Sequence, residues 1–535
     1  MEAWSWLWEA QNHNDELTRA FFTISIILIG IATSWYLWVY KKPVDRNSRL
    51  PPGPLGLPIV GNIPFIDPEL HRYFAKLTNK HGPIFKLKLG SKLVIVLGSP
   101  ELAEAVLKEF DSTFANRAPT VAAMSFSYGG ADIVFAEYGP HLRNVRALCA
   151  REILSKNNLD SFSTLRKQEF RRTLRSIYAR VDSAVDIRQE MYLTMLNVIM
   201  NMLWGGTLDD EDRNRIGAEF GRLAEEMINN LGRTNISDFF PVLAKFDLQG
   251  IERQMKELIS WLDTFFESLI DKRVKMDHEL KLNGDENSKK NEFKDFLQVF
   301  QKLQDQGESK TPFTTTNLKA LFMNLVVGGT DTSGVTVEWA MTELIKHPKI
   351  MKRAQDELDT VVGRNTNVEE SHVFKLPYLG AILKETLRLH PPVPLLVSRC
   401  PSSTCNVGGY AIPKGAQVFV NAWAIQRDPK YWDNPLEFQP ERFLQSTDKV
   451  DSIGTDFRYI PFGSGRRRCA GVPLVERMVP YALASLLHSF EWKMPEGVEI
   501  DLSDKFGIVV KKSTPLNAIP LPRLADPSLY IYTDC

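Results

Sequence analysis

The segment from Pro461 to Gly471 constrains this chain more than any other. It reads Pro-Phe-Gly-Ser-Gly-Arg-Arg-Arg-Cys-Ala-Gly, so glycines at 463, 465 and 471 surround Cys469. Glycine adopts positive φ readily and lets the backbone approach a flat ligand closely. A thiolate is a metal ligand, and adjacent arginines favour the deprotonated sulfur. The segment therefore predicts a metal-binding or cofactor-binding loop.

A phosphate-binding loop and a solvated arginine run are the alternatives for this segment. No Lys-Ser or Lys-Thr follows the glycines, as a phosphate loop requires, and no strand with a dinucleotide fingerprint precedes them. The other cysteines, at 149, 400, 405 and 535, form neither a dense disulfide framework nor a completed zinc site. The 65 basic residues balance 65 acidic ones, so no nucleic-acid partner is expected.

The first fifty residues predict a membrane anchor. Residues 21–40 carry no charged side chain, and 20 helical residues span about 30 Å, the thickness of one bilayer core. Acidic residues predominate before this stretch, and basic residues follow it at 41, 42, 46 and 49. Positive charge on this side predicts that the rest of the chain faces the cytosol. A cleaved signal peptide fits poorly, since the apolar run is too long and its leader is acidic.

Three parts are expected along the chain. The anchor occupies residues 1–42, and a Pro-rich hinge follows at 43–60, where the four prolines within residues 50–59 favour an extended segment. No second linker interrupts residues 61–535, which predicts one large domain.

Hydrophobic periodicity predicts the fold class of that domain. Short β-branched runs at 84–89 and 93–97 predict a β-hairpin, and residues 276–291, rich in charge, predict an exposed loop. Helical spacing dominates without βαβ alternation, so the chain is predicted to be mainly α with small β-sheets (α+β). Helices are expected near residues 100–110, 138–154, 160–181, 186–204, 211–231, 249–275, 293–305, 316–347 and 348–363.

Polar motifs mark a segment at 384–388 and the helix expected at 316–347. Glu385 and Arg388 are three residues apart, which places both charges on one helix face and lets them pair. The helix at 316–347 is apolar in its first half and should cross the core. Each glycine in its Gly328-Gly-Thr-Asp-Thr332 segment lowers the stability of the helix by about 1 kcal/mol relative to alanine. Two such glycines within a helix indicate a functional role. The alternative is that the hydroxyls bond back to the preceding turn.

Five spaced residues carry a resemblance to a known family. Phe462, Gly465, Arg467, Cys469 and Gly471 match Phe-x-x-Gly-x-Arg-x-Cys-x-Gly, and the chain resembles the cytochrome P-450 family. The resemblance implies the cytochrome P-450 fold around haem b, with Cys469 as the axial thiolate. In wording, the chain is most similar to plant endoplasmic-reticulum members that hydroxylate sesquiterpenes or flavonoids.

The resemblance also implies roles for residues outside this loop. Asp331 and Thr332 would handle protons during oxygen activation, and Arg442 would join Glu385 and Arg388 in a buried structural network. Leu142 stands where the family has a tryptophan, which puts haem retention in question. Haem contacts are expected at Arg146, Arg399, Phe462, Arg467 and Cys469. Substrate contacts are expected at Phe126, Phe135, Leu325, Gly329, Val393, Leu396 and Ile508.

The expected activity is insertion of one oxygen atom of O2 into a C–H bond of a lipophilic plant metabolite. Since the chain has no flavin or nicotinamide fingerprint, electrons should come from a separate NADPH-cytochrome P-450 reductase, with cytochrome b5 as a further candidate partner. That reductase is expected to dock near Arg466–Arg468. The expected location is the endoplasmic reticulum membrane, with a single span and a cytosolic catalytic domain. A haem-thiolate isomerase or dehydratase and a non-enzymatic membrane haem protein are the alternatives.

Overall fold

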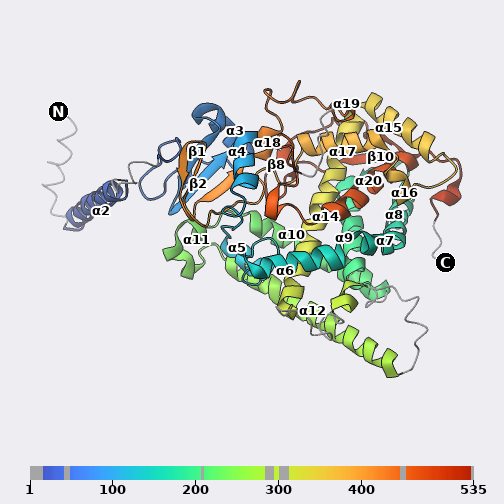
Figure 1. Cartoon of the computed structure of the whole chain (residues 1–535), viewed down its shortest axis with the longest axis horizontal. Coiled ribbons are helices and arrows are strands. Elements are labelled where there is room, and N and C mark those ends of the chain that lie inside the picture. Colours follow the sequence, from blue (N-terminus) through green and yellow to red (C-terminus); the bar gives the residue numbers. More distant parts are fainter. Residues whose placement is uncertain are drawn as a thin grey trace.

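A computed structural model describes residues 16–40, 49–205, 210–282, 295–300, 313–445 and 454–531. Helices make up most of the body, and β1 and β2 lie at the end of the body nearest the N-terminal helix (Figure 1). The main helices are α2 (Glu16–Tyr40), α3 (Leu70–His81), α4 (Pro100–Glu104), α5 (Val121–Phe126), α6 (Pro140–Leu148), α7 (Lys156–Ser161), α8 (Ser163–Tyr178), α9 (Ile187–Trp204), α10 (Asp210–Gly232), α11 (Ile236–Phe239), α12 (Ile251–Leu282), α14 (Thr315–Lys346), α15 (Pro348–Val361), α16 (Glu370–Val373), α17 (Pro377–Leu389), α18 (Ala422–Ile425), α19 (Arg442–Gln445) and α20 (Val472–Ser489).

The strands form small sheets. The predicted hairpin is confirmed: β1 pairs antiparallel with β2, and β2 pairs in parallel with β6. A second sheet has the order β3-β10-β7, and β4-β5 and β8-β9 are two-stranded. The strands are β1 (Ile84–Leu89), β2 (Lys92–Leu97), β3 (Val185–Asp186), β4 (Cys405–Val407), β5 (Tyr410–Ile412), β6 (Gln417–Val420), β7 (Phe490–Lys493), β8 (Asp504–Lys505), β9 (Lys511–Lys512) and β10 (Asn517–Pro522).

Helix α14 runs through the middle of the body, as its apolar sequence predicts (Figure 1). It begins with a capping box, in which the side chain of Thr314 accepts from the N–H of Asn317 and the Asn317 side chain accepts in return. Such a cap satisfies two N–H groups that a helix start leaves without partners. Most of its side chains from Leu318 to Leu344 are buried, and it packs against α9, α17 and α20.

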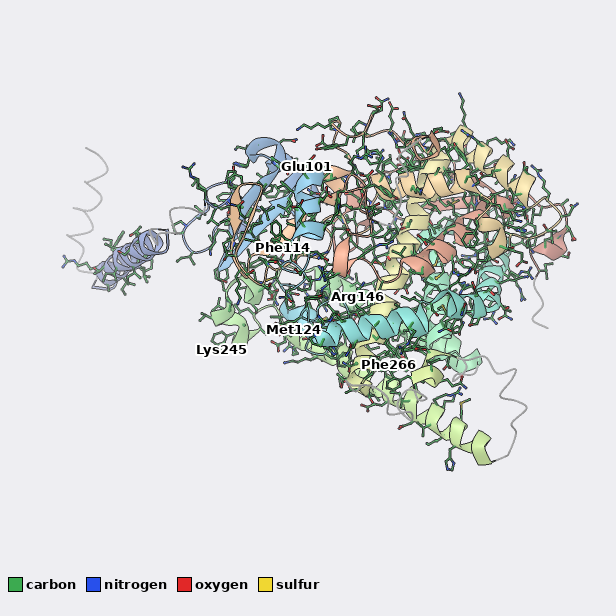
Figure 2. All side chains as sticks on the ribbon, viewed as in Figure 1. Glu101, Phe114, Met124, Arg146, Lys245 and Phe266 are labelled. Atoms are coloured by element: carbon green, nitrogen blue, oxygen red, sulfur yellow. The ribbon has the colours of Figure 1, made fainter. Side chains whose placement is uncertain are left out.

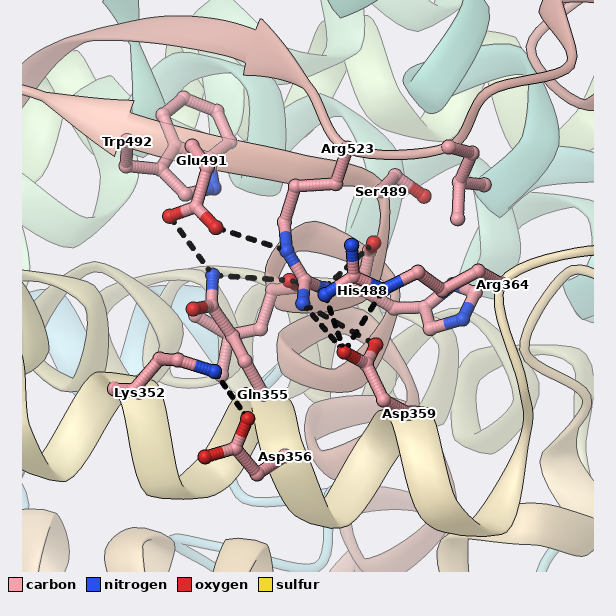
Figure 3. Close-up of polar contacts among 12 residues, drawn as sticks. Lys352, Gln355, Asp356, Asp359, Arg364, His488, Ser489, Glu491, Trp492 and Arg523 are labelled. Carbon is pink, nitrogen blue, oxygen red and sulfur yellow. Dashed lines mark hydrogen bonds and ion pairs between the residues drawn. The ribbon is translucent and has the colours of Figure 1, made fainter.

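A buried arginine fixes the segment that follows β10 to the rest of the body (Figure 3). The Arg523 guanidinium contacts both carboxylate oxygens of Asp359 on α15, at 3.2 and 3.1 Å, and Glu491 on β7 at 3.0 Å. It also donates to the carbonyls of Leu487 and His488 at the end of α20. Because each donor of this buried cation has an acceptor, its charge is compensated, and the last strand is joined to two helices.

Two expectations need comment. The charged segment at 276–291 is not a loop throughout, because α12 continues to Leu282; the remainder lies outside the described residues. Lysine and glutamate are good helix formers, so a charged sequence can extend an exposed helix.

Helix α2 exposes apolar side chains on all sides, among them Phe21, Ile26 and Ile29. Among the helices that the structure describes, none is both long enough and apolar enough to cross a membrane.

Candidate haem site

The loop before α20 holds Cys469 in a fixed conformation. Gly465 has φ of +70°, and a Cβ there would lie 2.4 Å from the carbonyl oxygen of Leu107, so this position requires glycine. The N–H of Cys469 donates to the carbonyl oxygen of Phe462 at 3.0 Å, which closes the loop. The thiol is solvent-accessible, although protein atoms surround it on most sides. The loop therefore leaves the Cys469 side chain accessible among the protein atoms around it.

The surroundings of this sulfur act in opposite directions on its protonation. Burial raises the pKa of the Cys469 thiol, while hydrogen bonds from the N–H groups of Gly471 and Val472 lower it. These groups lie at the N-terminus of α20, where the helix dipole favours an anion. The nearby Arg146 and Arg468 favour the thiolate as well. The donor set suits a sulfur that binds a metal ion as a thiolate.

One face of α14 is open although the rest of the helix is buried. Leu325, Gly328, Gly329 and Thr332 are at least partly accessible, whereas nearly all of their helical neighbours are buried. Spacings of three and four residues place these positions on one side of the helix. A Cβ at Gly328 would meet no atom within 4 Å. Gly328 therefore leaves open space on this face of the helix, between the side chains of Leu325 and Thr332.

The helix continues unbroken through these glycines. The Thr332 hydroxyl donates to the carbonyl oxygen of Gly328 at 2.7 Å, which is the back-bonding that the sequence left open. The carbonyl oxygen of Gly328 thus accepts a hydrogen bond from the hydroxyl while the backbone stays helical. Thr332 nevertheless remains partly accessible on the open face.

Asp331 lies beside this face and is bound by a lysine from another part of the chain. The Nζ of Lys511, on β9, is 2.8 Å from one carboxylate oxygen of Asp331. The other oxygen is buried and has no hydrogen-bond partner among the described residues. Burial raises the pKa of Asp331, and Lys511 partly offsets this effect. Sequence reasoning missed Lys511, because 180 residues separate it from its partner and no local pattern marks the pair.

Four arginines gather in the interior: Arg117, Arg146, Arg399 and Arg467. Burial lowers the pKa of Arg117, and the other three guanidinium groups lower it further. Burial also lowers the pKa values of Arg399 and Arg467, each to about 10. Asp111 and Asp132 offset part of this repulsion. Because buried cations are stable only when paired, this cluster suits a ligand that carries carboxylates.

The arginines come from four separate segments. Arg146 is on α6, in the centre of the body (Figure 2), and donates to the carbonyl oxygen of Arg468 at 2.8 Å. Arg399 donates to the carbonyl oxygen of Ser464 at 2.8 Å and contacts Asp111 at 3.4 Å. The sequence did not single out Arg117, since it lies in an irregular segment without a spaced motif.

Arg467 is buried and bonded to backbone, which corrects one expectation. Its guanidinium donates to the carbonyls of Ala115, Ile133, Val134 and Ala136. It therefore contributes to the interior cluster and not to a docking surface. Among the three consecutive arginines, Arg466 is exposed and Arg468 is intermediate. A run of like charges in sequence thus divides between interior and surface.

Glu385, Arg388 and Arg442 form one ion-pair network. Arg388 makes two hydrogen bonds to the Glu385 carboxylate, at 2.7 and 2.9 Å, and both side chains are fully buried. Arg442 adds a third at 3.0 Å, and the guanidinium of Arg388 lies 5.2 Å from the ring centre of Trp432. Arg388 also donates to the carbonyls of Gln426, Pro435 and Glu437. The network joins α17 to the segment that leads into the Cys469 loop.

The expected substrate contacts differ in exposure. Phe126 is buried and packs edge-to-face against Phe135, with ring centres 6.3 Å apart, so it supports its neighbour. A Cβ at Gly329 would lie 2.7 Å from the side chain of Ile199. Partly accessible positions are Phe135, Leu325, Gly329, Val393, Leu396 and Ile508.

Leu142 and Cys149 are core residues. Leu142 is buried in the main hydrophobic cluster, so the position where the family resemblance expects tryptophan is filled by aliphatic packing. Cys149 is buried as well, and burial raises the pKa of its thiol to about 12. Its thiol therefore stays protonated and inert at neutral pH.

Comparison with known proteins agrees with this geometry. The sequence model of the Cytochrome P450 family matches residues 51–519. The chain is 40% identical to a flavonoid 3',5'-hydroxylase of Solanum melongena, over 93% of this chain and 97% of that one. It is 38% identical to a flavonoid 3'-monooxygenase of Arabidopsis thaliana, over 92% and 95% of the two chains. A 7-ethoxycoumarin O-deethylase of Helianthus tuberosus is also 38% identical, over 93% and 99%.

A solved structure shares the fold. A zebra fish cytochrome P450 with abiraterone superposes with a TM-score of 0.69 at 25% identity, covering 85% of this chain and 99% of that chain. The chain therefore belongs to the cytochrome P450 family, and it is a haem-thiolate monooxygenase. The residues present suit haem: an accessible thiol, an open helix face and buried guanidinium groups for its carboxylates.

The ion-pair network predicts a large stability effect. Replacing Arg388 with methionine removes two hydrogen bonds from the buried Glu385 carboxylate and leaves several carbonyls without a donor, so the free energy of unfolding should fall by about 3 to 5 kcal/mol. The control is Arg353→Met, because Arg353 makes an exposed ion pair with Glu441 and should lose about 1 kcal/mol or less. Denaturant unfolding of the two purified variants measures both effects. Equal losses would show that the network adds nothing beyond a surface pair.

Proposed function

We propose that this monooxygenase hydroxylates a flavonoid or a closely related plant phenol. In the reaction a C–H bond of the substrate becomes C–OH, the second oxygen atom of O2 leaves as water, and NADPH supplies two electrons through a separate reductase. The observation that carries the proposal is the 40% identity to a flavonoid hydroxylase over nearly the whole of both chains. The sesquiterpene alternative stays open, since apolar contacts alone discriminate weakly.

In this proposal the Cys469 thiolate would bind the haem iron, and the haem, when bound, would supply the oxygen chemistry. Arg117, Arg146, Arg399 and Arg467 neutralise the carboxylates of the haem. What supports this assignment is the position of the sulfur at a helix N-terminus and the mutual repulsion of the arginines, which an anion relieves.

Asp331 and Thr332 are proposed to move protons on the open face of α14. The raised pKa of Asp331, caused by burial, brings its acid form nearer to neutral pH. Its unbonded oxygen can hold a proton or a water molecule, while Lys511 fixes the other oxygen. The Thr332 hydroxyl donates its hydrogen bond to the carbonyl oxygen of Gly328, so its oxygen lone pairs are free to accept a hydrogen bond on the accessible face. This acid–alcohol pair favours a monooxygenase over the isomerase alternative.

Phe135 is proposed to contact the substrate. A flat aromatic substrate fits against an aromatic side chain held edge-to-face by a buried neighbour. The buried ring of Phe126 packs edge-to-face against Phe135 and holds its orientation. Leu325, Val393, Leu396 and Ile508 would add aliphatic contacts, which suits recognition by shape.

Turnover by membranes containing the full-length chain and a plant NADPH-cytochrome P-450 reductase tests the substrate and the electron donor together. Flavonoids supplied under labelled O2 should each gain one labelled oxygen atom, and product should require both NADPH and the reductase. Parallel assays with sesquiterpenes serve as the comparison. Oxygenation of sesquiterpenes with untouched flavonoids would contradict the proposed substrate class. Conversion that persists without reductase would favour the isomerase or dehydratase alternative.

We further propose that residues 21–40 anchor the chain in the endoplasmic reticulum membrane with the body in the cytosol. The support is an apolar segment of bilayer length within α2, with exposed side chains and basic residues after it. After alkaline carbonate extraction the full chain should stay with the membrane pellet, whereas a chain without residues 1–42 should be released to a much greater extent. Equal retention of both proteins would contradict an anchor in this segment.

A further inference from the structure

The segment from Ala131 to Ala136, here named the Asp132 loop, is bonded on two sides. It follows α5 and carries Phe135, one of the proposed substrate contacts. Its N–H groups are bound by Asp132, within the loop, and by Asn324. Its carbonyl groups accept from two arginines outside the loop. The loop therefore joins parts of the site that the sequence keeps apart.

The N–H groups of the loop are held by Asp132 and Asn324. One Asp132 oxygen accepts from the N–H groups of Phe135 and Ala136, at 2.8 and 2.9 Å. Its other oxygen accepts from the side-chain amide of Asn324 at 3.1 Å, and Asn324 accepts from the N–H of Ile133 at 3.0 Å. Asn324 is on α14, next to the open face, and both polar side chains are buried. A closed ring of hydrogen bonds thus fixes the loop to α14.

The carbonyl groups of the same loop hold two arginines of the interior cluster. Ile133 and Val134 each accept from Arg467 at 3.3 Å, and Ala136 accepts from it as well. Val134 also accepts from Arg117 at 3.1 Å. Asp132 offsets part of the positive charge of both arginines. The shape of the loop therefore sets the direction of both guanidinium groups.

We propose that the Asp132–Asn324 pair is a positioning device that couples the substrate-contacting loop to the arginines that hold the haem. Asp132 and Asn324 touch neither haem nor substrate in this account. They act by fixing the backbone that orients Arg117 and Arg467 on one side and carries Phe135 on the other. The inference rests on the proposed role of these arginines in haem binding.

The chemistry of the pair allows a reciprocal exchange as its test. In Asp132→Asn, the new amide faces the amide of Asn324, so one hydrogen bond of the ring is lost. In Asn324→Asp, two carboxylates face each other. The double variant Asp132→Asn/Asn324→Asp restores every donor–acceptor match, with the charge on the other residue. Rescue by the double variant distinguishes a paired device from two independent structural residues.

Transfer of haem from the detergent-solubilised full-length protein to excess apomyoglobin gives a readout independent of turnover. Each single variant should lose haem about tenfold faster than the parent, as the loss of one charge-assisted hydrogen bond predicts. The double variant should approach the parent rate. Hydrogen exchange of the Phe135 and Ala136 amides should accelerate in the single variants and return toward the parent rate in the double variant.

Asp238→Asn is the matched control. Asp238 accepts from the N–H of Val121, the first residue of α5, at 2.9 Å. Its hydrogen bond does not involve the arginine cluster. This variant should retain haem as the parent does. Haem loss in the control equal to that of the single variants, or a double variant no better than either single, would overturn the coupling. If Arg467→Leu leaves haem transfer unchanged, the proposed haem role of Arg467 is wrong, whereas amide exchange still tests the ring itself.

Discussion

The interior of this protein concentrates positive charge where water cannot screen it. Burial and neighbouring guanidinium groups within the cluster of Arg117, Arg146, Arg399 and Arg467 lower the pKa values of Arg117, Arg399 and Arg467, and two carboxylates offset only part of that effect. Such an arrangement is costly unless an anion completes it. The carboxylates of a haem meet that requirement, and the accessible Cys469 thiol supplies the metal ligand on a neighbouring segment. Much of the surrounding structure serves to hold these groups in place.

Helix α14 carries the accessible positions of the candidate site. Its buried faces pack against α9, α17 and α20, so its position is fixed, while its open face presents Gly328, Gly329 and Thr332. Lys511 and Asn324 attach two distant segments to the same helix, one through Asp331 and the other through Asp132. If these residues act as proposed, proton handling and haem binding depend on side chains that this one helix organises.

Local patterns in the sequence predicted the hairpin, the long core helix and the glycine-rich cysteine loop, because turn chemistry and helical periodicity are local properties. The pairing of Glu385 with Arg388 followed from their spacing on one helix face. Other features arise only from tertiary contacts. No pattern marks Arg117, and Asp132 meets Asn324 across 192 residues of sequence. The charged end of α12 and the buried Arg467 show that charge alone does not separate loop from helix, or surface from interior.

The central claim is that Cys469 is the thiolate ligand of a haem held by this fold. The absorption spectrum of the reduced, carbon monoxide-treated protein measures that bond directly, because a thiolate opposite carbon monoxide moves the Soret band far to the red. The freshly purified parent should show this band, and Cys469→Ala should lose it. A red-shifted band that survives in Cys469→Ala, or that is missing from the haem-loaded parent, would contradict the account.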